Sequence, residues 1–395
     1  MDLRYEAEQL FGYTQQNRRT LHQHPELAFK EFKTAKLVAS ELSKLGLEVS
    51  SGFGVTGVVA EIEGAHAGPT IALRFDMDAL PIQEENSVDY ASAIQGCMHA
   101  CGHDAHVAIG LTVARILEQH KDDLHGKVRL LFQPGEEGAG GAEAFIADGG
   151  MGTPYPDAIF GLHVWNEKPI GWLGVAEGPI MAGSSSFTVK INGKGGHGAI
   201  PHLSADPVVA MANLITAAQT IVSRNTNPID AGVLSFCAVQ GGEAFNVIPN
   251  AVTLKGTIRS FQPHVSSNIR QRLNEISQNV CSAFGCTASV EFIENTQPVI
   301  NDSRTTKIVD AVCSHLYPQM NLDRQGMITM GAEDFAAYLA KVPGTFFFVG
   351  SNNPQKGLIH GHHHPQFDID EESLVTGVTI MAGVALRYGS SMPIS

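Results

Sequence analysis

The sequence is poor in cysteine and contains no long apolar run. Its 395 residues have six cysteines, too few for a disulfide scaffold, which favours a reducing compartment. The most apolar C-terminal run, Val375 to Leu386, is shorter than a membrane span and is interrupted by Gly377 and Gly383. The first residues carry mixed charge and lack the apolar segment of a signal peptide. We therefore expect a cytoplasmic protein without a transmembrane span.

Positive charge is also scarce. Lys and Arg number 26 against 40 Asp and Glu, which gives a formal net charge of −14. Because nucleic acids and anionic membranes attract basic surfaces, neither is expected as the main partner. Histidine, in contrast, is frequent, with 17 copies. Two short segments hold many of them, and their members are His99, His103 and His106, then His360, His362, His363 and His364.

Strands and helices alternate in the first and last parts of the chain. Apolar periodicity predicts strands at 57–64, 70–76, 127–134, 158–164 and 345–350. It predicts helices at 3–22, 32–45, 106–119, 141–148, 303–317, 333–342 and 371–388. Such alternation is typical of the α/β class, with a mostly parallel sheet covered by helices on both faces.

The order of elements changes near Met181. From there a strand, a helix, two strands, a helix and a strand follow one another, which is the β-α-β-β-α-β order of a ferredoxin-like unit. We therefore predict a small domain over 183–296, inserted into a larger domain built from 1–182 and 297–395.

Candidate metal ligands follow several predicted strands. In open α/β sheets, ligands bind outside the carboxyl ends of the strands. The candidates there are Asp76 and Asp78, Cys101 and His103, Glu136 and Glu137, His163, and the histidines of 360–364. Each has a plain alternative alone, such as a small structural zinc knot at 97–106 or an acidic surface turn at 136–137. Together they predict two metal ions, and the mixed ligand types suit Zn²⁺, Mn²⁺, Co²⁺ or Ni²⁺.

A family resemblance is carried by nine motifs spread over nearly the whole chain. They are HPELAFKEFKT (24–34), RFDMDALPIQE (74–84), MHACGHDAH (98–106), LFQPGEEGAGGA (131–142), GLHVW (161–165), KGGHGAIPHLSADP (194–207), FNVIPNAVTLKGTIR (245–259), MGAEDF (330–335) and HHPQFDID (363–370). This set resembles the metal-dependent amidohydrolase branch of the aminoacylase and glutamate carboxypeptidase superfamily. Hippurate hydrolases and auxin–amino-acid conjugate hydrolases belong to that branch.

The resemblance implies a two-metal catalytic domain and a ligand set. Cys101 corresponds to the ligand that bridges the metals. The terminal ligands it implies are His103, Glu137, His163 and His363. His363 is the match to the family pattern His-x-Pro, while His362 and His364 remain alternatives for that position.

The resemblance also implies catalytic and substrate-binding roles. Glu136 corresponds to the general acid/base, and Asp78 to a residue that supports a metal-site histidine. In the inserted domain, which serves as a lid and a dimer contact, His197 corresponds to the group that stabilises the oxyanion. Asn246 and Arg259 correspond to substrate-binding residues, and a guanidinium suits the α-carboxylate of the substrate.

The expected function is hydrolysis of the amide bond of a small N-acyl-amino acid by a homodimer or homotetramer. A carboxypeptidase or dipeptidase on the same scaffold is the main alternative. A metal-storing or metal-sensing protein is the non-enzymatic alternative, but it leaves Glu136, Asn246 and Arg259 unexplained.

Overall fold

The computed structural model describes residues 2–325 and 327–390. Over these ranges the chain forms two compact units, each with its own hydrophobic core. The first unit comprises the chain up to Ile180, Ile300–Ile328 and the segment from Asp334 onward, and the second comprises Met181–Val299 and Thr329–Glu333. No helix within the described ranges has the length and apolar content needed to cross a membrane.

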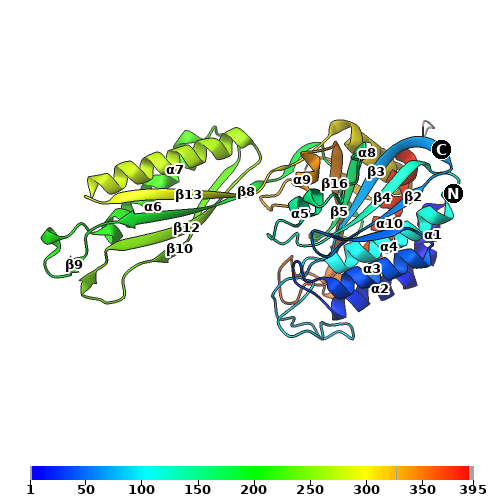
Figure 1. The fold of residues 1–395 in the computed structure, drawn as a ribbon, viewed down its shortest axis with the longest axis horizontal. Coiled ribbons are helices and arrows are strands. Elements are labelled where there is room, and N and C mark those ends of the chain that lie inside the picture. Colours follow the sequence, from blue (N-terminus) through cyan, green and yellow to red (C-terminus); the bar gives the residue numbers. More distant parts are fainter. Residues whose placement is uncertain (1, 326, 391–395) are drawn as a thin grey trace. The chain divides into compact units, whose positions relative to one another are not determined.

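A mixed sheet of eight strands, in the order β1-β2-β4-β3-β5-β16-β6-β15, forms the centre of the first unit (Figure 1). Its strands are β1 (Val49–Phe53), β2 (Gly57–Glu63), β3 (His66–Asp76), β4 (His125–Gln133), β5 (Ala158–Pro169), β6 (Trp172–Gly174), β15 (Asn321–Asp323) and β16 (Gly344–Asn352). The four strands β4, β3, β5 and β16 are parallel, whereas β1 and β2 form an antiparallel hairpin at one edge. The predicted α/β class is thus confirmed.

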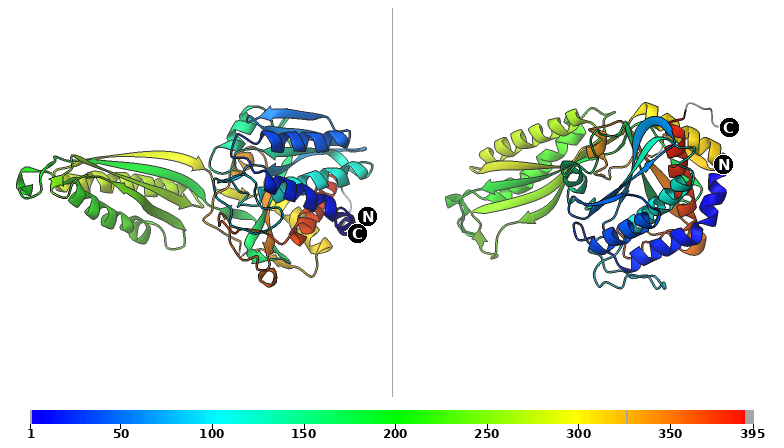
Figure 2. Two further views of the ribbon diagram at one scale, coloured as in Figure 1. Left: turned by 90° about the horizontal axis from the view of Figure 1, so that it is seen from below. Right: turned by 45° about the vertical axis from the view of Figure 1, so that its right-hand side comes forward.

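Helices cover both faces of this sheet. They are α1 (Leu3–Gln9), α2 (Phe11–Gln23), α3 (Phe32–Lys44), α4 (His103–Gln119), α5 (Gly141–Ala147), α8 (Ser303–Leu316), α9 (Ala336–Leu339) and α10 (Glu372–Tyr388). On one face α4 packs against α10, and α2 and α3 lie beside α4 (Figure 2). In β5, Leu162 faces Gly377 of α10, whereas the next residue back, Gly161, faces Phe335 at the start of α9. Because neighbouring residues of a strand face opposite sides, α9 lies on the other face.

Three of the predicted helices differ from the observed ones by more than a terminal residue. The helix predicted over 106–119 begins three residues earlier, at His103. The single helix expected over 3–22 is interrupted at Leu10, where α1 ends and α2 begins. The helix expected over 333–342 is reduced to the four residues of α9. Asp334 lies before this short helix, and its side chain accepts hydrogen bonds from the buried Arg74 and Gln133 instead of facing solvent.

The second unit is a four-stranded antiparallel sheet in the order β10-β12-β8-β13 with two helices. Its main elements are β8 (Gly183–Asn192), α6 (Pro207–Asn225), β10 (Gly232–Gln240), β12 (Ala251–Ser260), α7 (Pro263–Ala283) and β13 (Thr287–Thr296). Short pieces of this unit are β9 (Gly196–His197), β11 (Val247–Ile248) and the 3₁₀ turn η1 (Pro201–Leu203). The paired strands β7 (Gly178–Met181) and β14 (Val299–Asn301) lie where the chain passes from one unit to the other, and the 3₁₀ turn η2 (Pro354–Lys356) belongs to the first unit. The chain order β-α-β-β-α-β is the one that the sequence indicates.

Candidate metal centre and catalytic residues

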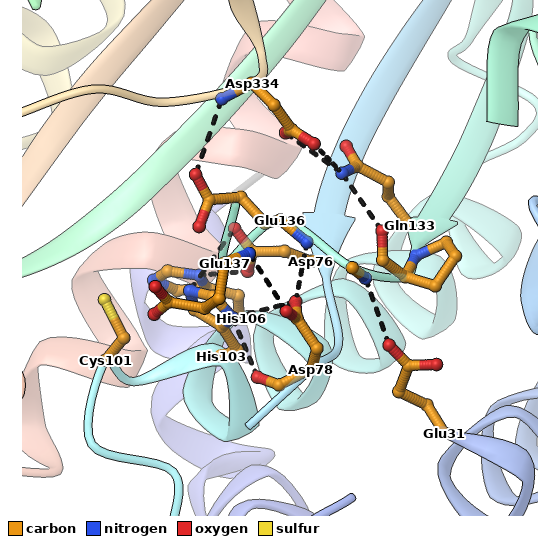
Figure 3. A network of polar contacts seen from close by, with 12 residues as sticks. Glu31, Asp76, Asp78, Cys101, His103, His106, Gln133, Glu136, Glu137 and Asp334 are labelled. Carbon is orange, nitrogen blue, oxygen red and sulfur yellow. Dashed lines mark hydrogen bonds and ion pairs between the residues drawn. The ribbon is translucent and has the colours of Figure 1, made fainter. Parts of the chain in front are cut away.

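The carboxyl ends of neighbouring parallel strands bring the candidate residues together. Asp76 is the last residue of β3, and its partner in the ladder, Gln133, is the last residue of β4. Glu136 follows β4 by three residues, and His163 lies in β5 on the other side of β3. His103 is the first residue of α4, and Cys101 precedes it by two (Figure 3).

Two groups of possible metal ligands share Cys101. One consists of Cys101, His103 and His163, and the other of Cys101, Glu137 and His363. Within each group, the donor atoms lie within 4.8 Å of one another. The geometry therefore offers two adjacent cation positions with the sulfur of Cys101 common to both.

The ring orientations of two histidines fit metal binding. His103 donates a hydrogen bond from Nδ1 to the backbone oxygen of Asp78 at 2.9 Å, and His163 donates from Nδ1 to the backbone oxygen of Val164 at 2.6 Å. A backbone oxygen only accepts, so the hydrogen of each neutral ring is on Nδ1 and the Nε2 lone pair is available. Nε2 of His103 is buried without a hydrogen-bond partner, and Nε2 of His163 is 3.5 Å from the sulfur of Cys101.

The charges of this cluster also suit a cation. Burial raises the pKa of the Cys101 thiol, and the carboxylates of Glu137 and Glu136 raise it further. Burial lowers the pKa of His103, but the nearby Asp76 and Asp78 carboxylates outweigh burial and raise it to about 10. The excess negative charge of the carboxylates thus favours the protonated forms of Cys101 and His103. A divalent ion bound to these side chains would take the place of the protons.

The three consecutive histidines have three different environments. Nε2 of His363 is 3.2 Å from Oε1 of Glu137, whereas Nδ1 of His364 accepts a hydrogen bond from the backbone of Gln366 at 3.0 Å. Nε2 of His362 accepts one from the backbone of Asn166 at 3.2 Å. His363 alone of the three belongs to a ligand group among the described residues.

The backbone of His363 has a strained conformation. Its φ angle is 64°, a left-handed conformation that costs a non-glycine residue about 1–3 kcal/mol. Its N–H donates to the backbone oxygen of Ala100 at 2.8 Å, which joins this loop to the loop of Cys101.

Asp78 organises the segment that carries the adjacent glutamates. Its two carboxylate oxygens accept hydrogen bonds from the N–H groups of Glu136 and Glu137, each at 3.0 Å (Figure 3). The buried Glu31 accepts a further hydrogen bond from the N–H of Gly135 at 3.0 Å. The backbone N–H of Asp334 lies 3.4 Å from Oε1 of Glu136. The turn after β4 is therefore fixed from three sides.

Sequence reasoning assigned no role to the buried cation at the centre of this network. Arg74 is 1% exposed. Its Nη1 lies 2.5 Å from Oδ2 of Asp76, its Nη2 lies 2.8 Å from Oδ1 of Asp334, and its Nε donates to Oε1 of Gln133 at 2.8 Å. It thereby connects the strand end beside His103 to the segment that faces Glu136. Arg74 and Asp334 lie in the motifs RFDMDALPIQE and MGAEDF, so the family resemblance was the signal in the sequence that could have identified them.

His106 is a supporting residue in this geometry. Its Nδ1 is 2.6 Å from Oδ1 of Asp76, and its Nε2 accepts a hydrogen bond from the backbone N–H of Val164 at 3.0 Å. Both ring nitrogens are used, so His106 fixes the strand position next to His163 and has no lone pair left for a metal.

The remaining predicted residues lie in the second unit. His197 in β9 pairs with Val247 in β11, and the N–H of Gly198 donates to the backbone oxygen of Asn246 at 2.8 Å, so His197 and Asn246 are close. Nδ1 of the exposed His197 accepts the N–H of Ala199 at 3.0 Å, which leaves the hydrogen of a neutral ring on Nε2.

Arg259 lies on β12 of the same unit. It neighbours the core residue Ile258 and therefore points to the opposite face of the sheet. It is half-buried, and burial lowers its pKa. Its guanidinium has no hydrogen bond or ion pair to any described residue.

Known proteins resemble this chain over almost its full length. The sequence model of the peptidase family M20/M25/M40 matches residues 72–387. Thermostable carboxypeptidase 2 of Saccharolobus solfataricus is 38% identical over 392 residues, which is 98% of this chain and 98% of the relative. The N-acetyl-L-cysteine deacetylase of Bacillus subtilis is 41% identical, over 91% of this chain and 84% of the relative. The solved structure of a Bacillus subtilis dinuclear metal-binding peptidase of the M20 family superposes with a TM-score of 0.84 and 33% identity, over 98% of this chain and 100% of that one.

Proposed function

Because this chain belongs to the peptidase family M20/M25/M40, we propose that it is a hydrolase with two metal ions that cleaves the amide bond of small N-acyl-amino acids. Family membership makes it a metal-dependent hydrolase of amide bonds. The observation that supports the proposal best is the pair of ligand groups sharing Cys101, with Glu136 next to the ligand Glu137. A deacetylase among the relatives supports an acyl group as the part removed.

The proposed ligands are five. Cys101 would be a ligand common to both ions, and His103, His163, Glu137 and His363 would complete the two sets of ligands. Bound divalent ions at such a pair of sites supply Lewis acidity for the amide carbonyl and the attacking water. The ligand types suit Zn²⁺, Mn²⁺, Co²⁺ or Ni²⁺. The fit rests on the buried, unpartnered Nε2 of His103 and on the ligand groups described above.

Glu136 is the proposed general acid/base. It takes the proton of the water that attacks the amide carbonyl and then delivers a proton to the leaving nitrogen. Asp78 positions it through the backbone of the turn, and the N–H of Asp334 orients its carboxylate. Because these contacts hold Glu136, its carboxylate can accept and return a proton while the proposed ligand Glu137 stays in place.

His197, Asn246 and Arg259 of the second unit are the proposed substrate contacts. The Nε2–H of His197 is a suitable donor to the oxyanion of the tetrahedral intermediate, since its Nδ1 already accepts a backbone N–H. The guanidinium of Arg259, unpaired among the described residues, suits the α-carboxylate of the substrate.

The proposed assembly is a homodimer or homotetramer formed through the second unit. The edge strand β10 carries the exposed Val239, and Phe245 is fully exposed. Unpaired strand edges and exposed aromatic residues favour association with another chain. The proposed location is the cytoplasm, because all six cysteines are free.

A carboxypeptidase or dipeptidase is the second candidate, favoured by the carboxypeptidase among the relatives. The test is a panel of N-acetyl-amino acids, N-benzoyl-amino acids and dipeptides, each measured with Zn²⁺, Mn²⁺, Co²⁺ or Ni²⁺. We expect the highest kcat/KM for an N-acyl substrate. Preference for dipeptides would replace the proposal with the second candidate, and metal binding without turnover of any substrate would favour a metal-storing protein.

A further inference from the structure

The two histidines that face the sulfur of Cys101 present opposite hydrogen-bonding groups. His163 directs Nε2 at the sulfur from 3.5 Å, and this nitrogen carries a lone pair because Nδ1 donates to a backbone oxygen. His362 directs Nδ1 at the same sulfur from 3.8 Å. Its Nε2 accepts the backbone N–H of Asn166, and a backbone amide can only donate, so the hydrogen of the neutral His362 ring is on Nδ1.

The position of the His362 ring is fixed by its surroundings. Its centroid is 4.8 Å from that of Trp165 and 5.1 Å from that of Phe367, so the ring is held by aromatic contacts. The side chain of Asn166 is itself hydrogen-bonded to the backbone oxygens of His360 at 2.6 Å and Asp368 at 3.0 Å. These contacts therefore hold the Nδ1–H group of His362 in a position from which it points toward the sulfur of Cys101.

We propose that His362 is a positioning residue that donates a hydrogen bond from Nδ1 to the sulfur of Cys101 and so moderates its strength as the shared ligand. The inference rests on the proposed bridging role of Cys101. An N–H donor withdraws electron density from a thiolate, and hydrogen bonds to cysteine sulfur are a known means of tuning metal centres. The hydrogen on Nδ1 also excludes His362 as a ligand through this atom, because a nitrogen that carries a hydrogen has no lone pair for a metal.

The test uses two variants that separate the two ring nitrogens. The side-chain N–H of asparagine reaches the place of Nδ1, so His362→Asn retains the donor to the sulfur. The side-chain oxygen of glutamine reaches the place of Nε2, so His362→Gln retains only the acceptor for Asn166. Both variants and the wild-type protein are loaded with Co²⁺, and the sulfur-to-cobalt charge-transfer band is recorded with the metal content and the melting temperature.

We expect two Co²⁺ per chain in all three proteins. The charge-transfer band of His362→Gln should move to longer wavelength because its sulfur has lost a donor, whereas that of His362→Asn should stay near the wild-type position. Loss of one Co²⁺ from both variants would show that His362 is a ligand, and an unchanged band in His362→Gln would show that it donates nothing. Absence of the band from the wild-type protein would instead overturn the bridging role of Cys101 and leave the inference without its basis. If one variant fails to fold, the other still reports the band and the metal content.

Discussion

Arg18 in α2 and Asp104 in α4 form a fully buried ion pair, with 2.9 Å between Nε and Oδ2. Arg18 also contacts Asp368 at 2.6 Å and Glu371 at 3.3 Å. Asp104 directly follows the proposed ligand His103, and Asp368 follows the loop of His363. Although α2 supplies no ligand, its arginine thus joins the two segments that carry ligands.

Replacement of Arg18 by Met should destabilise the protein strongly. The change leaves carboxylates buried without their cation, which costs about 3–5 kcal/mol for a broken buried pair. The measurement is urea unfolding of the metal-free protein. The neighbouring Arg19 pairs with Glu371 but is 39% exposed, so Arg19→Met should cost about 1 kcal/mol or less. Equal losses in the two variants would contradict the special role of Arg18.

His22 should make stability fall as the pH rises. Burial lowers its pKa, but Asp104, with Oδ2 2.7 Å from Nδ1, outweighs burial and raises the pKa to about 9. The folded protein then binds a proton that the unfolded chain, with a pKa near 6.5, releases. This contribution is fully present below about pH 6.5 and is lost by about pH 9.

The measurement is the free energy of unfolding of the wild-type protein and of His22→Gln between pH 6 and pH 9.5, about the range over which the shift acts. The difference between them should shrink with rising pH by up to about 3 kcal/mol. A difference that is constant over this range would show that His22 is neutral in the folded state.

His363 and His364 provide a matched test of the ligand set. His363→Ala should leave one tightly bound metal per chain instead of two, because the group of Cys101 and Glu137 loses its third ligand. His364→Ala should retain both, since its ring stacks on His360 with centroids 4.2 Å apart. Elemental analysis after dialysis measures the content. Loss of a metal from His364→Ala alone would transfer the ligand role to that residue.

Glu136→Gln should remove catalysis without removing metal. The amide keeps the shape of the side chain but cannot accept the proton of the attacking water, so kcat should fall by about 10²–10⁴-fold. Metal content and melting temperature should match those of the wild-type protein. Near-normal hydrolysis of the best N-acyl substrate by this variant would exclude Glu136 as the general acid/base.

The sequence predicts those parts of the candidate site that follow from one rule of sheet geometry. Asp76, Glu136 and His163 each follow or end an apolar run, and the carboxyl ends of parallel strands meet at one edge of the sheet. The same reasoning predicts the α/β class and the β-α-β-β-α-β order, because both follow from local periodicity.

The sequence does not predict contacts between distant buried charges. Arg18 and Asp104 are 86 residues apart, and an arginine on an amphipathic helix is normally solvated. Nor does periodicity show where a helix stops. The apolar pattern continues through Leu10 and through 333–342, but the first helix breaks at Leu10 and Asp334 turns inward to Arg74. The polarity of the His362 ring is fixed by a backbone N–H of Asn166, which no sequence pattern specifies.

Arg259→Met should impair binding of the substrate carboxylate. The guanidinium remains charged although burial lowers its pKa, and hydrogen bonds to a charged group contribute about 1.5–3 kcal/mol. KM for an N-acyl-amino acid should therefore rise about 10- to 100-fold, with a smaller change in kcat. The control substrate is the corresponding carboxamide, which has no carboxylate and should be hydrolysed equally by both proteins. An equal rise in KM for both substrates would mean that Arg259 supports the fold of the second unit and does not contact the carboxylate.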